Sequence, residues 1–106
     1  MPKFLVRAQY TPEGAKGVLK DGGSGRKKAV ETLLASVGGK LEAFYFTFGA
    51  DDAMIIIDVP SAETALAIAM TVRASGTIAS EMTPLMPVEE VDRAAELSIP
   101  FHPPGS

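Results

Sequence analysis

The segment from Gly38 to Pro60, GGKLEAFYFTFGADDAMIIIDVP, restricts the possible folds more than any other part of the chain. It contains two apolar stretches, Leu41–Phe48 and Ala53–Val59, which are separated by the short polar sequence GADD at residues 49–52. Alternation in the first stretch and β-branched residues in the second are typical of strands, so the segment is predicted to form a β-hairpin. Both strands carry apolar residues on both faces, and such strands occur where each face of a sheet is covered.

Hydrophobic periodicity predicts the remaining elements around this hairpin. Period-two alternation indicates strands, while apolar residues at helical spacing, together with capping residues and terminal glycines, indicate helices. The predicted elements, in chain order, are a strand at Lys3–Tyr10, a short helix at Pro12–Lys20, a break at Asp21–Gly25, a helix at Gly25–Val37, a helix at Ser61–Ala74, a strand at Thr77–Thr83 that ends at Pro84, and a last helix at Pro87–Leu97.

This order predicts an α+β fold of the ferredoxin-like βαββαβ type with an additional C-terminal helix. The two main helices would cover one face of a four-stranded antiparallel sheet. Strict alternation divides the first hairpin strand into two apolar sets, one of which must lie on the uncovered face. The sets are Phe44, Phe46 and Phe48, and Leu41, Ala43 and Tyr45. Neither set suits contact with water, so we expect sheet-to-sheet dimerisation, which would produce a two-subunit barrel.

The length and composition are typical of one globular domain spanning residues 1–106. The chain has no cysteine, no apolar leader and no stretch long enough to span a membrane, so we expect a cytoplasmic location and no membrane partner. The formal net charge of −3 argues against a nucleic-acid partner, because nucleic-acid-binding surfaces usually carry a clustered basic excess. With His102 as the only histidine, we predict no metal site and no cofactor.

The Pro-rich tail at residues 98–106 cannot be helical, because prolines interrupt it repeatedly. Ile99 and Phe101 could dock on the body of the domain or on a neighbouring subunit, and the tail would otherwise be loose. His102 could act as a general base only if the tail folded over a pocket. We therefore interpret His102 as an exposed residue of the tail.

The hairpin and the residues around it resemble the GYD-domain family of small bacterial and archaeal proteins. The similarity covers roughly residues 3–86 and includes Tyr10-Thr11, the helix end LLASVGGKLEAFYF and the run GGKLEAFYFTFGADDAMIIIDVPS. The family signature is a glycine, a variable residue, a tyrosine and an aspartate before the third strand. Gly49 and Asp52 match this signature, and Asp51 replaces the tyrosine. The resemblance implies a ferredoxin-like domain of the dimeric α/β-barrel group but no particular reaction, because the family's biochemical function is largely uncharacterised.

Polar residues among apolar strand neighbours, and one in the turn, are the candidate ligand-binding residues. They are Arg7, Tyr10, Tyr45, Asp52 and Glu81. If Arg7 and Glu81 point into the barrel, they could pair with each other or hold a polar ligand. Tyr10 and Tyr45 could line a pocket with free hydroxyl groups, or they could be core or interface aromatics whose hydroxyl groups are hydrogen-bonded. Asp52 could contribute to a cation site with its neighbour, but we interpret this acidic pair as turn residues that bond nearby backbone.

The glycine-rich sequence GGSG at residues 22–25 precedes the basic cluster Arg26-Lys27-Lys28. Such a loop could cradle an anion, but it lacks the residue order of a phosphate-binding loop. We interpret it as a flexible loop between two helices, with solvated lysines. Because no serine or cysteine can be matched with a credible histidine base, the catalytic residues are unknown.

Three functions are compatible with these features. The leading interpretation is a homo-oligomeric binding module that holds a small apolar or amphipathic molecule between the sheet and the helices. The second is a cofactor-free enzyme acting on a small hydrophobic substrate, with Arg7, Tyr45, Asp52 and Glu81 as its polar groups. The third is a purely structural assembly module. A cavity into which Arg7 or Glu81 points would favour the binding module or the enzyme.

Overall fold

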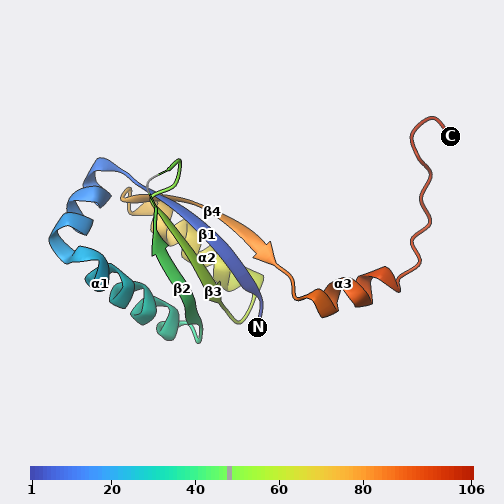
Figure 1. Ribbon diagram of the computed structural model, residues 1–106, viewed down its shortest axis with the longest axis horizontal. Helices are drawn as coiled ribbons and strands as arrows, with labels where there is room; N and C mark the ends of the chain where they lie inside the picture. Colours follow the sequence, from blue (N-terminus) through green and yellow to red (C-terminus); the bar gives the residue numbers. More distant parts are fainter. Residues whose placement is uncertain (48) are drawn as a thin grey trace.

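Figure 1 shows the computed structural model of the chain, which describes residues 1–47 and 49–106. The bounds of the elements are β1 Lys3–Tyr10, α1 Pro12–Ser36, β2 Lys40–Phe46, β3 Ala53–Asp58, α2 Ala62–Ala74, β4 Ile78–Leu85 and α3 Val88–Ala95. The predicted bounds of β1 are confirmed at both ends. The prediction that placed Phe48 at the end of the first hairpin strand falls outside the described residues.

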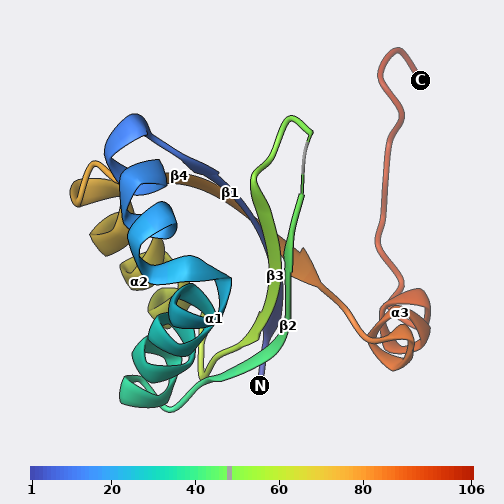
Figure 2. The same ribbon diagram turned by 60° about the vertical axis from the view of Figure 1, so that its left-hand side comes forward.

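The strands form one four-stranded antiparallel sheet in the order β2-β3-β1-β4, with β3 and β1 in the centre. Figure 2 shows α1 and α2 on one face of the curved sheet and neither of them on the opposite face, which we call the open face. α1 packs mainly on β2 and α2 packs mainly on β4, so the two helices lie over opposite halves of the sheet. This arrangement confirms the predicted ferredoxin-like α+β fold.

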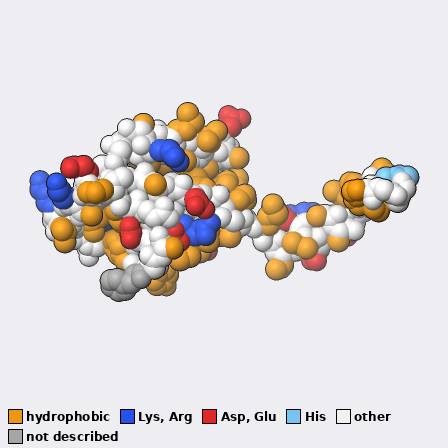
Figure 3. Space-filling view, turned by 90° about the horizontal axis from the view of Figure 1, so that it is seen from above, with side chains coloured by type: hydrophobic (Ala, Val, Ile, Leu, Met, Phe, Trp, Pro, Cys, Tyr) orange, Lys and Arg blue, Asp and Glu red, His pale blue; other side chains and the backbone are white. Residues whose placement is uncertain are grey.

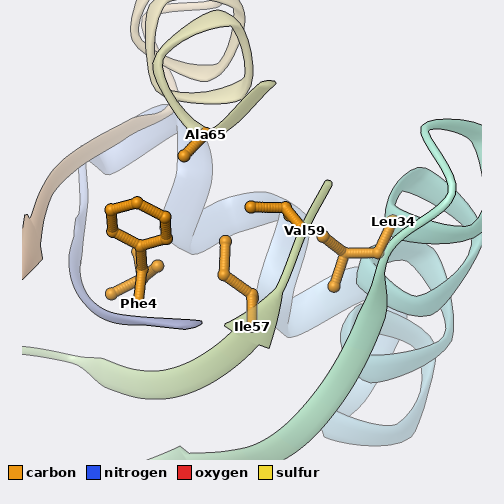
Figure 4. Close-up of a cluster of buried hydrophobic side chains, with 6 residues drawn as sticks. Phe4, Leu34, Ile57, Val59 and Ala65 are labelled. Atoms are coloured by element: carbon orange, nitrogen blue, oxygen red, sulfur yellow. The ribbon is translucent and has the colours of Figure 1, made fainter. Parts of the chain in front are cut away.

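A small apolar core joins the sheet to these two helices (Figure 4). Its buried members are Phe4 and Val6 on β1, Ile57 on β3, Val59 just after β3, Leu34 on α1 and Ala65 on α2. Val59 and Leu34 lie side by side, whereas the ring of Phe4 extends toward Ala65. Burying a large aliphatic or aromatic side chain stabilises a protein by roughly 1.5–3 kcal/mol. Contacts of this kind hold α1 and α2 on the sheet.

α1 combines the two helices that the sequence predicts. Thr11 caps it, because its hydroxyl accepts a hydrogen bond from the Gly14 amide at 3.3 Å, and Pro12 occupies the first turn. The predicted break at Asp21–Gly25 is too long, because only Gly22 leaves the helical region, with φ of 73° and ψ of 171°. Glycine adopts this conformation at no steric cost, so one residue kinks the helix without an intervening loop.

A bulge in β2 corrects the predicted division of that strand into faces. Leu41 pairs with Ile57 and Ala43 pairs with Ile56, so Glu42 is an extra residue between the two pairs. The extra residue places Leu41 on the same face as Ile57, where it packs against the core. Strict alternation was therefore wrong for Leu41, which does not share a face with Ala43.

β4 continues past the point at which Pro84 was predicted to end it. Pro84 pairs with Phe4, and the following residue, Leu85, pairs with Lys3. β4 lies at the edge of the sheet and pairs on one side only, so a residue without an N–H group is tolerated there. The prediction was wrong because the local sequence does not reveal which strand will lie at an edge.

The C-terminal segment projects away from the rest of the domain (Figure 1). The predicted last helix is present as α3, which has no buried residue and makes no extensive packing contact with another element. Ile99 and Phe101, which follow it, are each 75% exposed. Neither side chain therefore docks on the body of its own chain, although docking there was one of the arrangements that the sequence allowed.

Candidate functional site

A cavity of about 90 Å³ lies between the sheet and the two helices that cover it. Both helices and all four strands contribute to its wall, which is almost entirely apolar. Representative lining residues are Val6, Val30, Phe44, Ile55, Ile68 and Val72. The cavity forms because α1 and α2 lie over opposite halves of the sheet and leave its central strands incompletely covered.

Polar side chains border this cavity at Tyr10, Arg26 and Ser80. Tyr10 and Arg26 also border a second hollow of about 130 Å³, so the two spaces adjoin each other. The second hollow is the more polar of the two, and its wall includes Glu13 and Asp21. An apolar interior with a few polar groups on one border is the usual composition of a small-molecule site.

Arg26 supplies the clearest polar feature of this site. Within the described part of the chain, its Nε is buried and makes no hydrogen bond. A buried donor without a partner costs free energy, so an acceptor atom from a ligand would stabilise the site. The two lysines of this cluster were predicted to be solvated, and both Lys27 and Lys28 are exposed, whereas Arg26 is half-buried. The overlooked signal is that Arg26 lies one helical turn before Val30 on the apolar stripe of α1.

Three of the predicted site residues lie in one row on the open face, opposite the cavity. Arg7 pairs with Glu81 on one side and with Met54 on the other, and Met54 pairs with Tyr45. The guanidinium Nη2 of Arg7 lies 2.8 Å from Oε2 of Glu81, so the two charges neutralise each other. Val6, which precedes Arg7 on β1, is buried in the core, and alternation therefore directs this row away from the cavity.

The other two predicted site residues lie near the turn of the hairpin. Tyr10 borders both hollows, as a pocket residue would. Asp52 accepts a hydrogen bond from the Tyr10 amide through Oδ2 at 2.8 Å, and its own amide donates to the Ala8 carbonyl at 2.8 Å. Asp51 accepts a hydrogen bond from the side chain of Gln9. The two aspartates thus fasten the hairpin turn to the end of β1.

A second ionic cluster lies on the open face at the other end of β1. The Lys3 Nζ donates hydrogen bonds to Glu42 at 2.7 Å and to Asp58 at 3.1 Å. The hydrogen bond to Glu42, and then the one to Asp58, raise the pKa of Lys3 above its ordinary value because they favour the charged ammonium. The cluster joins β1 to both hairpin strands, and we assign it a structural role.

These observations define a class of protein: a ferredoxin-like α+β domain with an apolar cavity behind its sheet and an open sheet face in front. A family model described as the GYD domain matches residues 4–95, and the chain therefore belongs to the GYD-domain family. The matched region extends beyond the predicted resemblance and includes α3. A search of curated proteins and a search of solved structures each find no match.

Among residues 1–47 and 49–106, no group of three or more histidine, aspartate or glutamate side chains is arranged to hold a metal ion. No helix described there combines the length and the apolar character that crossing a membrane requires.

Proposed function

We propose that this chain is a binding module that holds a small apolar or amphipathic molecule in the cavity between the sheet and the helices. The observation that carries the proposal is the apolar cavity bordered by the buried, unpartnered Nε of Arg26. A dry engineered cavity of about 150 Å³ can hold benzene, so a space of about 90 Å³ accommodates only a few carbon atoms. A larger ligand would extend past Tyr10 and Arg26 into the adjoining polar hollow.

Replacement of Ala69 by leucine tests this proposal, because Ala69 lines the cavity and a larger side chain would occupy it. We expect Ala69→Leu to abolish ligand retention while the protein stays folded, since the added carbon atoms replace those of the ligand. Native mass spectrometry of protein purified from its own host reports any retained mass. Titration with pentanol and with pentanoate, followed by NMR, distinguishes a neutral from an anionic head group.

The matched control is Ala67→Leu, which makes the same change on an exposed position of α2. We expect this variant to bind as the unmodified chain does. The proposal is contradicted if the unmodified chain carries no extra mass and neither probe shifts the signals of residues that line the cavity.

We also propose that two copies pack through their open faces and form a sheet-to-sheet dimer in the cytoplasm. Leu5 and Ile56 are half-buried on this face, and Tyr45 is 70% exposed. Apolar and aromatic surface of this kind is commonly buried in protein interfaces. Because Arg7 and Glu81 already pair with each other, an approaching subunit would not leave either charge without a partner.

Tyr45→Arg is expected to raise the dissociation constant of this dimer at least tenfold, because it places an unpaired charge in the interface. Sedimentation velocity over a range of concentrations measures the change. Leu66→Arg is the control, since Leu66 is similarly exposed, at 60%, but lies on α2. A monomeric mass for the unmodified chain at micromolar concentration would contradict the proposed dimer.

A cofactor-free enzyme has less support than the binding module. Its proposed polar groups, Arg7, Tyr45 and Glu81, lie on the open face rather than in the cavity. The Nη2 of Arg7 and the Glu81 carboxylate form an ion pair, and Asp52 accepts a hydrogen bond from the Tyr10 amide of β1. None of these groups is therefore placed to act on a molecule inside the cavity.

A further inference from the structure

The segment from Met86 to Phe101, which we call the C-terminal arm, exposes apolar side chains that its own chain does not cover. Figure 3 shows these hydrophobic side chains along the arm, apart from the body of the domain. The exposed residues are Met86, Val88, Val91, Leu97, Ile99 and Phe101, with exposed fractions between 59% and 75%. Soluble proteins rarely leave a continuous series of large apolar residues in water without a binding role.

α3 is too short to be stable as an isolated helix. Helices of fewer than about 12 residues are marginal in water unless an apolar side packs against something. α3 has eight residues, and Val88 and Val91 lie on one side of it at helical spacing. Three acidic residues, Arg93 and two alanines occupy the other positions, so the helix is amphipathic. The family match extends to Ala95, so α3 is part of the domain that the family shares.

The connection between β4 and α3 directs the arm away from its own sheet. Pro87 has φ of −59° and ψ of 152°, which is an extended conformation. Met86 precedes a proline, and such residues are held in extended conformations by steric contact with the proline ring. An extended residue does not reverse the chain direction, and the arm does not fold back on the body (Figure 1). Figure 2 shows α3 on the side of the open face, away from α1 and α2.

The net charge of the arm favours one packing partner over another. Four acidic residues and the single cation Arg93 give the arm a net charge of −3, which equals the formal charge of the whole chain. The rest of the chain is therefore neutral overall. Two arms that packed on each other would bring like charges together, whereas an arm that packs on the body of a second copy would not.

We propose that the C-terminal arm is exchanged between two copies of this chain, so that the apolar side of each α3 packs on the body of the other subunit. This inference rests on the proposed sheet-to-sheet dimer, since a second copy on the open face lies on the side toward which the arm extends. Exchange of an identical element between protomers is a low-cost route to a dimer. Because α3 has no buried residue in its own chain, packing on a partner would not have to displace an existing contact.

The double variant Val88→Asp/Val91→Asp of the full chain tests the exchange. Both side chains are exposed within one subunit, so the body is expected to fold normally. We expect the dissociation constant of the dimer to rise at least tenfold, as sedimentation velocity would measure. In the unmodified dimer, the amides of α3 are expected to exchange with deuterium at least tenfold more slowly than in the variant. Leu19→Asp is the matched control, because Leu19 is 87% exposed on α1, and it should change neither value.

The outcomes separate this inference from the proposed dimer. A dimer whose α3 amides are unprotected, or whose affinity is unchanged in Val88→Asp/Val91→Asp, overturns the exchanged arm and leaves the sheet interface intact. An unmodified chain that is monomeric at every concentration overturns both. Loss of α3 protection in Tyr45→Arg, together with dissociation, supports the arm contact across the dimer.

Discussion

Replacing Gly14 with alanine is expected to destabilise the domain by about 2–3 kcal/mol, because overpacking at a rigid contact has effects of this size. A Cβ atom on Gly14 would lie 1.9 Å from the Thr77 carbonyl oxygen and 2.9 Å from the Thr77 carbonyl carbon. The Thr77 carbonyl cannot easily move away, because it also accepts a hydrogen bond from the Thr11 amide at 3.0 Å. The start of α1 would therefore have to separate from the start of β4.

Gly17→Ala is the matched control for this prediction. It lies on the same helix, and no heavy atom beyond its chain neighbours and the helix backbone lies within 4 Å of the position that a Cβ would occupy. Alanine at this position should stabilise the domain by up to about 1 kcal/mol, because glycine is the poorer helix former. Thermal unfolding measures both variants, and Gly14→Ala should lower Tm by about 10–20 °C at this domain size. Equal shifts for the two variants would show that the contact with Thr77 does not restrict the helix.

Asp52→Ala is expected to lower the free energy of unfolding by about 1.5–3 kcal/mol, the range for a hydrogen bond to a charged group. Asp52 accepts from the Tyr10 amide at 2.8 Å, and its side chain is half-buried. Alanine would leave that amide without its partner and would release the hairpin turn from the end of β1. Urea denaturation of the variant and of the unmodified chain gives the difference.

Asp52→Asn separates the hydrogen bond from the charge, because asparagine retains an acceptor oxygen. We expect it to recover part of the stability that Asp52→Ala loses. One outcome would assign Asp52 a role in binding instead of in the turn. If Asp52→Ala unfolds at the same urea concentration as the unmodified chain and has lost a bound ligand, Asp52 belongs to a binding site rather than to the turn.

The fold could be predicted because its evidence is local. Alternation along Lys3–Tyr10, the apolar hairpin strands and the capping residues Thr11 and Ser61 each indicate an element without reference to the rest of the chain. The predictions of strand faces and strand ends failed at residues whose place in the sheet depends on the neighbouring strand. Glu42 is the extra residue in the pairing of β2 with β3, and its side chain accepts a hydrogen bond from Lys3 on β1. Pro84 is tolerated because β4 pairs with β1 alone among the described strands.

The candidate site was less predictable than the fold. Alternation placed Arg7 and Tyr10 on opposite faces of β1, but it could not show which face the helices would cover. The cavity lies on the face of Tyr10, so Arg7 and Glu81 became an ion pair on the open face. The sequence places Arg26 beside a glycine-rich stretch and two lysines, and only the packing of α1 on the sheet shows that it borders the cavity.

The sequence by itself determined the order and type of the elements, the need to cover an apolar sheet and membership of the GYD-domain family. Those properties follow from side-chain periodicity and turn chemistry, which act over a few residues. Only the tertiary structure decided where the cavity lies, which polar groups border it and that α3 stands away from its own body. The cavity and its polar border depend on how α1 and α2 cover opposite halves of the sheet. The position of α3 depends on the extended conformation of Pro87. The hairpin at residues 38–60 required partners on both faces, and the packed chain provides them on only one.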